Sequence, residues 1–144
     1  MMITNSLREY LAYVAFRRMP YDGQLIVTNI NGTQLYDFRN WYINDNSKYK
    51  IALGSGTTPP KKTDYRLGNQ IIDAPARLDM TKGMATASIT YKNTTNSDIV
   101  ATEIGLLDDN EHGHWLLARE LFEKPVTIKA GETKSFSITL DFNV

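Results

Sequence analysis

The stretch of this sequence richest in side chains that could bind a metal is DDNEHGH, residues 108–114. A His-x-His pair on an extended segment places two imidazoles on one side, as a tetrahedral or octahedral site requires. The alternative is a solvated hairpin tip, where Asp, Asn and Gly supply turn conformations and bind nothing. His112, His114 and Asp109 are weak metal candidates in a spacing that matches no known metal motif, so we expect no metal and no other cofactor.

A second candidate for chemistry is the glycine-rich stretch LGSGTTPPKK, residues 53–62. A Walker loop needs four residues between its glycines and then Gly-Lys-Ser/Thr, whereas Ser55 alone separates Gly54 from Gly56. The two prolines that follow have no N–H to donate and favour an extended chain. We therefore expect a strand end at residue 53, a turn, and a polyproline-like connection over the surface.

The sequence contains no convincing set of residues for nucleophilic catalysis. A Ser-His-Asp triad needs a histidine beside the nucleophile, and the two histidines both lie in the 108–114 loop. No Gly-x-Ser-x-Gly elbow occurs. We name no catalytic residue and expect that the protein is not an enzyme.

Glu103 stands out because it lies in the apolar stretch VATEIGLL, where a buried charge needs a partner. Arg119, in LLAREL, is the natural partner if the two stretches form neighbouring strands. A structural ion pair is a better interpretation than a catalytic acid, because both residues fall within expected strands and not on loops.

Aromatic residues gather between residues 36 and 42 and could stack on sugars. In a strand, however, such residues more often form core or subunit contacts. A carbohydrate- or host-surface-binding β-sandwich module is therefore the alternative function, and assembly is the first. The candidate assembly residues come from this strand and from an expected N-terminal helix: Leu7, Tyr10, Leu11, Val14, Tyr36, Phe38 and Trp41.

That helix is predicted from a capping box at Ser6 to Glu9, apolar residues at helical spacing, and a stop at Pro20. From there the pattern alternates. Asn31-Gly32 predicts a hairpin, and strands are expected at 25–30, 35–43, 49–53, 85–91, 99–107, 115–122 and 135–144. The expected fold is mainly β: an antiparallel β-sandwich, jelly-roll or immunoglobulin-like, with one N-terminal helix over 1–20 and a single sandwich domain over 21–144.

Composition excludes several classes of protein. The chain has 144 residues, 16 basic and 16 acidic, and no cysteine. The balanced charge argues against nucleic acid as a partner, and the lack of cysteine excludes disulfides and thiol catalysis. No apolar stretch reaches the ~20 residues that span a bilayer, and charged residues interrupt any secretion signal near the N-terminus. We expect neither membrane insertion nor a small-molecule substrate.

Three segments resemble small structural proteins of tailed bacteriophage virions: ALGSGTTPPKKTDYRL, ATEIGLLDDNEHGHWLLARELF and PVTIKAGETKSFSITLDF. The resemblance covers the region from Tyr49 to the C-terminus and consists of turn and core positions. The matching residues are Leu53, Gly54, Gly56, Pro59, Asp64, Leu67, Glu103, Gly105, Leu106, Ala118, Arg119, Phe122, Gly131 and Thr133.

The resemblance implies a β-sandwich that oligomerises or docks on other virion proteins in the tail, neck or capsid surface. Its partners would be copies of itself and neighbouring virion proteins, and its location the virion, after synthesis in the host cytoplasm. The resemblance carries no catalytic residue to this chain.

Overall fold

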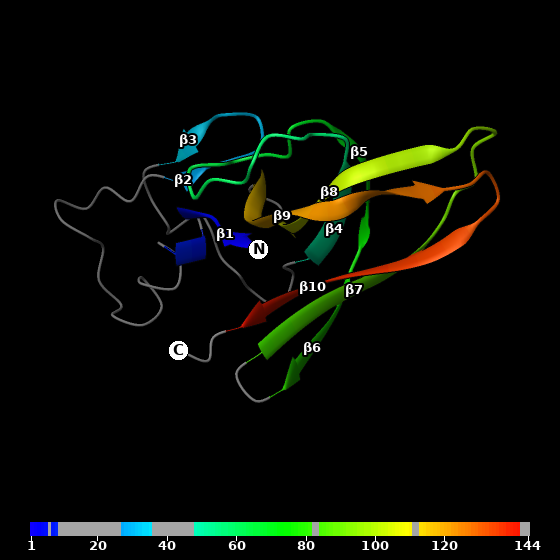
Figure 1. The fold of residues 1–144 in the computed structure, drawn as a ribbon. Helices are drawn as coiled ribbons and strands as arrows, with labels where there is room; N and C mark the ends of the chain where they lie inside the picture. The colour runs from blue at the N-terminus through cyan, green and yellow to red at the C-terminus, as the bar shows by residue number, and fades with distance from the viewer. Residues whose placement is uncertain (6, 9–26, 36–47, 82–83, 111–112, 142–144) are drawn as a thin grey trace, which may run out of the picture.

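The computed structural model describes residues 1–5, 7–8, 27–35, 48–81, 84–110 and 113–141, and the regular elements in these ranges are all β-strands (Figure 1). The ten strands are β1 (Met2–Ile3), β2 (Val27–Thr28), β3 (Gln34–Leu35), β4 (Lys48–Gly54), β5 (Gln70–Pro75), β6 (Arg77–Thr81), β7 (Met84–Lys92), β8 (Ile99–Asn110), β9 (Gly113–Ile128) and β10 (Thr133–Asp141). The expectation of a mainly β, antiparallel protein is confirmed.

The strands form two main antiparallel sheets and one small hairpin. The five-stranded sheet has the order β1-β9-β8-β4-β5, and the three-stranded sheet has the order β10-β7-β6. β2 and β3 pair only with each other among the described strands. Figure 1 shows the three-stranded sheet, with β10 and β7 in front, running below β8 and β9.

A single hydrophobic core joins the two main sheets. Alternating residues of β10 (Phe136, Ile138 and Leu140) are buried, while the serines and threonines between them face solvent, as their period-2 pattern predicts. They pack in one cluster with residues of the five-stranded sheet such as Ile104 and the fully buried Trp115. The alternation expected for the strand at 135–144 is therefore confirmed as far as Asp141, and residues 142–144 lie outside the described residues.

The Asn-Gly signal near residue 31 predicts a hairpin, and this prediction is confirmed. Gly32 has a φ of 82°, a left-handed conformation that favours glycine. The Asn29 side chain accepts hydrogen bonds from the backbone N–H groups of Asn31 and Thr33 and so fixes the turn. The N–H of Ile30 donates to the carbonyl of His114, which holds the hairpin beside the start of β9.

β8 and β9 are longer than their sequence pattern suggests. The segment 108–114, expected as a loop, belongs largely to the two strands, and β9 continues without interruption past its expected end at residue 122 to Ile128. Two register irregularities in the β8–β9 ladder, at 101/103 and 106/107, absorb the extra residues. Long, bent strands of this kind interrupt simple alternation.

β5 and β6 are absent from the sequence prediction. Each is the outermost strand of its sheet, and only Ala76 separates them, so one nearly continuous segment crosses from one sheet to the other. All five residues of β6 are exposed, and Pro75 ends β5. Strands at a sheet edge bury few side chains and tolerate proline, which removes the usual apolar alternation.

The predicted N-terminal helix is not borne out as an element: among the described residues only Asn5, Leu7 and Arg8 are helical, with the Arg8 N–H donating to the Thr4 carbonyl at 3.2 Å. Met2 and Ile3 instead form β1, which pairs with Arg119 and Ala118 of β9. Residues 9–20, which would form most of that helix, lie outside the described residues. The capping box expected at Ser6 to Glu9 follows β1 in the sequence, and both Ser6 and Glu9 lie outside the described residues.

Asn93 joins two turns at the end of the molecule where β7 and β9 finish. Its fully buried amide donates to the carbonyls of Ser97 and Ile128 at 2.8 and 2.9 Å and accepts hydrogen bonds from Thr95. The Gly131 N–H donates to the Asn93 carbonyl, so the turn before β10 is held as well.

Replacing Asn93 with alanine is expected to lower the free energy of unfolding by about 2–3 kcal/mol, because buried backbone groups lose their partners. Urea unfolding followed by circular dichroism measures this change. Thr94→Ala, at the exposed neighbouring position, is the matched control and is expected to change stability by less than about 0.5 kcal/mol. Equal losses in the two variants would contradict this assignment.

Candidate functional site

The loop between β4 and β5, residues 55–69, lies over the face of the five-stranded sheet that points away from the main core. Leu67 anchors it there, in a second apolar cluster with Ala52, Leu107 and Leu116. Gly105 provides the space, since a Cβ at that position would lie 2.8 Å from Leu67 Cδ2. Both faces of the sheet are therefore covered at this point, which explains the near-continuous burial along β4 and β8.

Beneath the loop, the side chain of Glu103 is 0% exposed and forms four hydrogen bonds. Oε1 accepts from the N–H groups of Gly56 and Asn69 at 2.8 and 3.0 Å, and Oε2 accepts from the N–H of Gly68 at 3.1 Å. The fourth donor is Nε of Arg119, at 2.7 Å from Oε2. The glycine-rich loop thus holds an anion after all, but that anion is the protein's own carboxylate.

Arg119 continues this network from β9 to the loop. The β8–β9 register pairs Glu103 with Leu121, two residues from Arg119, so the ion pair is a diagonal one on one sheet face. Nη1 of Arg119 donates to Asp64 at 2.8 Å, and Nη2 donates to the carbonyl of Thr58 at 3.0 Å. Asp64 also accepts the Lys61 N–H, which closes a turn in the loop.

We call Gly56, Asp64, Gly68, Asn69, Glu103 and Arg119 the Glu103 cluster. The sequence pairs Glu103 with Arg119, and the structure brings these two residues together. Sequence reasoning missed the role of Asp64 and of the three backbone donors. The signal that could have found them is the turn-rich segment 54–69 itself, whose glycines leave amide groups accessible to a carboxylate.

The glycines of the cluster permit this close approach. A Cβ on Gly56 would lie 2.8 Å from the Cα of Gly68 and would also collide with the Glu103 carboxylate. A Cβ on Gly54 would lie 2.5 Å from Glu103 Oε1 and 2.6 Å from the carbonyl oxygen of Asn69. Real Cβ atoms do not reach such distances, so these positions require glycine because backbone and carboxylate meet there.

The cluster holds both of its central groups in their charged forms. Burial raises the pKa of Glu103, but the hydrogen bonds from Asn69, Arg119, Gly68 and Gly56 together outweigh it and bring the pKa below its ordinary value. Burial lowers the pKa of Arg119, but the hydrogen bonds and charges of Asp64 and Glu103 outweigh this effect. The pKa of Arg119 is therefore above its ordinary value. The site is therefore a fixed ion pair and not a proton donor near neutral pH.

The lowered pKa of Glu103 predicts a loss of stability in acid. Its folded-state pKa lies below the unfolded value of about 4.3, so the unfolded chain binds more protons and stability falls as the pH drops through this range. Wild type should therefore lose more stability than Glu103→Gln between about pH 5 and pH 2. Urea midpoints measured across this range test the prediction, and parallel curves for the two proteins would contradict it.

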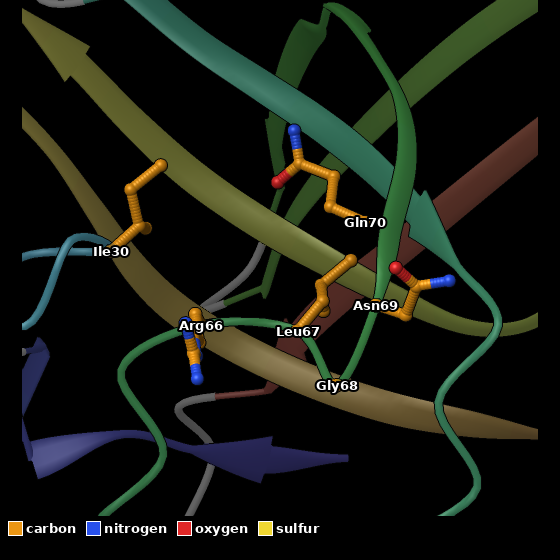
Figure 2. Close-up of a pocket in the computed structure, with 6 residues that line it drawn as sticks. All are labelled: Ile30, Arg66, Leu67, Gly68, Asn69 and Gln70. Carbon is orange, nitrogen blue, oxygen red and sulfur yellow. The ribbon is translucent and has the colours of Figure 1, made fainter.

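Two hollows open beside the cluster. One, with a volume of about 340 Å³, is lined by Ile30, Arg66, Leu67, Gly68, Asn69 and Gln70 (Figure 2). The other, of about 410 Å³, lies over Asp64 and Arg119 and also includes Lys61 and Tyr65. In Figure 2 the side chains of Arg66 and Gln70 point in opposite directions. The side-chain amide of Asn69 donates a hydrogen bond to the hydroxyl group of Ser55.

Two of the residues considered for metal binding, Asp109 and His114, contact each other, and Asp109 also contacts Lys50. Asp109 lies between two basic groups, with Oδ2 at 2.9 Å from Lys50 Nζ and Oδ1 at 2.7 Å from His114 Nδ1. The hydrogen bond that Lys50 donates to Asp109 raises the pKa of Lys50, so this cation is retained. His112 lies outside the described residues, and within those residues no group of three potential ligands occurs.

Of the candidate assembly residues, the structure describes only Leu7. Its side chain is 5% exposed and packs in the main core, so its apolar contacts are made within its own chain. The other six, Tyr10, Leu11, Val14, Tyr36, Phe38 and Trp41, lie outside the described residues.

Comparisons with protein-family models, with curated protein sequences and with solved structures find no significant match to this chain. Within the described ranges, the structure contains no helix of the length and apolar character needed to cross a membrane.

Proposed function

We propose that this chain is a non-enzymatic structural protein of a tailed bacteriophage virion. It acts by oligomerising or by docking on other virion proteins in the tail, neck or capsid surface. The observation that carries the proposal is the Glu103 cluster. The charged and glycine-rich residues that could have served catalysis are engaged in fastening a loop to a sheet.

The residues of the phage resemblance support this interpretation. Gly54, Gly56, Asp64, Glu103 and Arg119 are among the matching positions, and they lie far apart in the sequence but in contact in the fold. The resemblance thus describes one three-dimensional unit, a loop held on a sheet by a buried carboxylate. Such a unit supplies rigidity, which a repeated structural subunit needs.

The arrangement of the sheets is consistent with the proposal. Two antiparallel sheets with a shared core support the proposal that the fold is a β-sandwich, of jelly-roll or immunoglobulin-like type. A general acid must reach its substrate, whereas the Glu103 carboxylate has no solvent exposure and accepts four hydrogen bonds. The aromatic residues that a sugar-binding function would need at 36–42 lie outside the described residues, so no second function is proposed.

Immunogold labelling of purified phage particles tests the proposal. Particles are prepared from a lysate in which the gene is expressed during phage growth and are labelled with antibody against the purified protein. We expect gold at one structural position, with the protein retained through a density gradient in a fixed ratio to the major capsid protein. A protein that stays in the soluble fraction, with unlabelled particles, would contradict the proposal.

A further inference from the structure

The outer edge of β6 is an open strand edge. β6 pairs with β7 on one side, and among the described residues no strand lies on its other side. In Figure 1 it forms the lower margin of the three-stranded sheet. Its unpaired backbone groups are thus available to another strand.

β6 is short and carries two charged side chains, which protect such an edge in part, but several other protective features are missing. Its five residues include neither proline nor lysine, and its ladder with β7 has no register shift. β5, an edge strand of the other sheet, ends in Pro75 and carries an irregularity opposite Leu53 and Gly54. The exposed fractions of Leu78 and Met80, 39% and 79%, are high for apolar side chains on a sheet.

The charges of β6 are arranged so that the strand is complementary to itself. Arg77 and Asp79 are 80% and 60% exposed and lie on the same face, on either side of Leu78, where Arg77 Nη2 is 3.6 Å from Asp79 Oδ1 of the same strand. Pairing with a second copy replaces this exposed ion pair with pairs between the two strands. When two β6 strands run antiparallel and the two Leu78 residues lie opposite each other, each Arg77 lies opposite Asp79 of the second copy. Opposite charges in directly facing positions stabilise a strand pair, and like charges destabilise it.

The symmetric register centred on Asp79 is less favourable. Centring the pair on Asp79 sets two carboxylates directly against each other. Centring it on Leu78 instead brings the two leucine side chains together. These lie on the core side of the sheet, since Leu78 pairs with the buried Ala87.

We propose that β6 pairs in antiparallel fashion with β6 of a second copy of this chain, in the register centred on Leu78. The result is a continuous six-stranded sheet, β10-β7-β6-β6-β7-β10, with a two-fold axis through its centre. This inference rests on the proposed function, since it names one contact through which copies of the protein assemble.

Charge reversal tests this register. Arg77→Asp creates two facing acidic pairs, and Asp79→Arg creates two facing basic pairs, so each variant should associate about tenfold or more weakly than wild type. An equimolar mixture of the two variants restores opposite charges across the interface and should form heterodimers. The double variant Arg77→Asp/Asp79→Arg should regain the wild-type dimer.

The measurement is the molar mass from light scattering over a concentration series of wild type, both single variants, their mixture and the double variant. Thermal unfolding serves as the folding control, and because both side chains are largely exposed, the midpoints should agree. A wild-type monomer at all concentrations would overturn the inference. Single variants with the wild-type mass, or a mixture that stays monomeric, would overturn it as well.

The particle-labelling experiment separates the two proposals. A chain that is labelled on particles but is monomeric in solution would reject the β6 contact and leave the virion assignment in place. A dimer that responds to the charge swap but is missing from particles would support the contact and reject the virion assignment.

Discussion

Replacing Glu103 with alanine should lower the free energy of unfolding by about 3–5 kcal/mol. The change removes the carboxylate that accepts the N–H groups of Gly56, Gly68 and Asn69, and it leaves Arg119 buried with one carboxylate fewer. Each buried donor without a partner adds a desolvation penalty of about 1–3 kcal/mol, although water entering the loop offsets part of it. Urea unfolding at pH 7 measures the total.

Arg119→Met is the informative comparison for this prediction. It removes the guanidinium but leaves Glu103 with its three backbone donors, and its long apolar side chain fills part of the space. We therefore expect a smaller loss than for Glu103→Ala. A larger loss for the arginine variant would show that the ion pair, and not the set of backbone amides, is the main contribution of Glu103.

Gly56→Ala is expected to cost about 2–4 kcal/mol, because the added methyl group must displace backbone or the Glu103 carboxylate. The nearest backbone atom, the Cα of Gly68, belongs to the other side of the loop stem and cannot move without opening it. Thermal or urea unfolding detects the change, and the loop should become more susceptible to limited proteolysis.

Thr57→Ala is the matched control for the glycine substitution. Thr57 is exposed on the same loop, so its loss should alter stability by no more than about 0.5 kcal/mol. If both variants unfold at the same urea concentration, the close contact between Gly56 and Gly68 does not constrain the loop.

The strands that the sequence predicts best are those with one face exposed to solvent and the other packed on the core. β7 and β10 alternate cleanly, because one face of their sheet packs on the core and the other meets solvent. The hairpin at Gly32 follows from backbone stereochemistry alone. In each case a local rule and the global fold require the same residues.

The elements that the sequence did not predict are strands formed by pairing with residues far away in the sequence, without an apolar pattern of their own. β6 buries none of its side chains, so its sequence carries no core pattern. β1 exists because β9 provides a ladder more than a hundred positions away, and no local signal at Met2 and Ile3 reports that pairing.

The candidate site divides in the same way. A lone glutamate in an apolar strand requires a partner, and that requirement predicts Arg119. The backbone donors cannot be predicted, since they depend on how the loop folds back over β8. Segment 53–62 fails as a phosphate loop because its glycines approach a carboxylate held in the neighbouring strand, with Gly56 donating to Glu103 across 47 positions.

The central claim is that the Glu103 carboxylate holds the loop by its backbone amides, and amide hydrogen exchange tests it most directly. NMR measurements on the wild-type protein should show Gly56, Gly68 and Asn69 exchanging as slowly as amides within the β8–β9 ladder. In Glu103→Gln, which keeps the shape of the side chain, the same three amides should exchange faster while the β7–β10 ladder stays protected. Wild-type exchange at these three positions at the rate of an unstructured peptide would contradict the account.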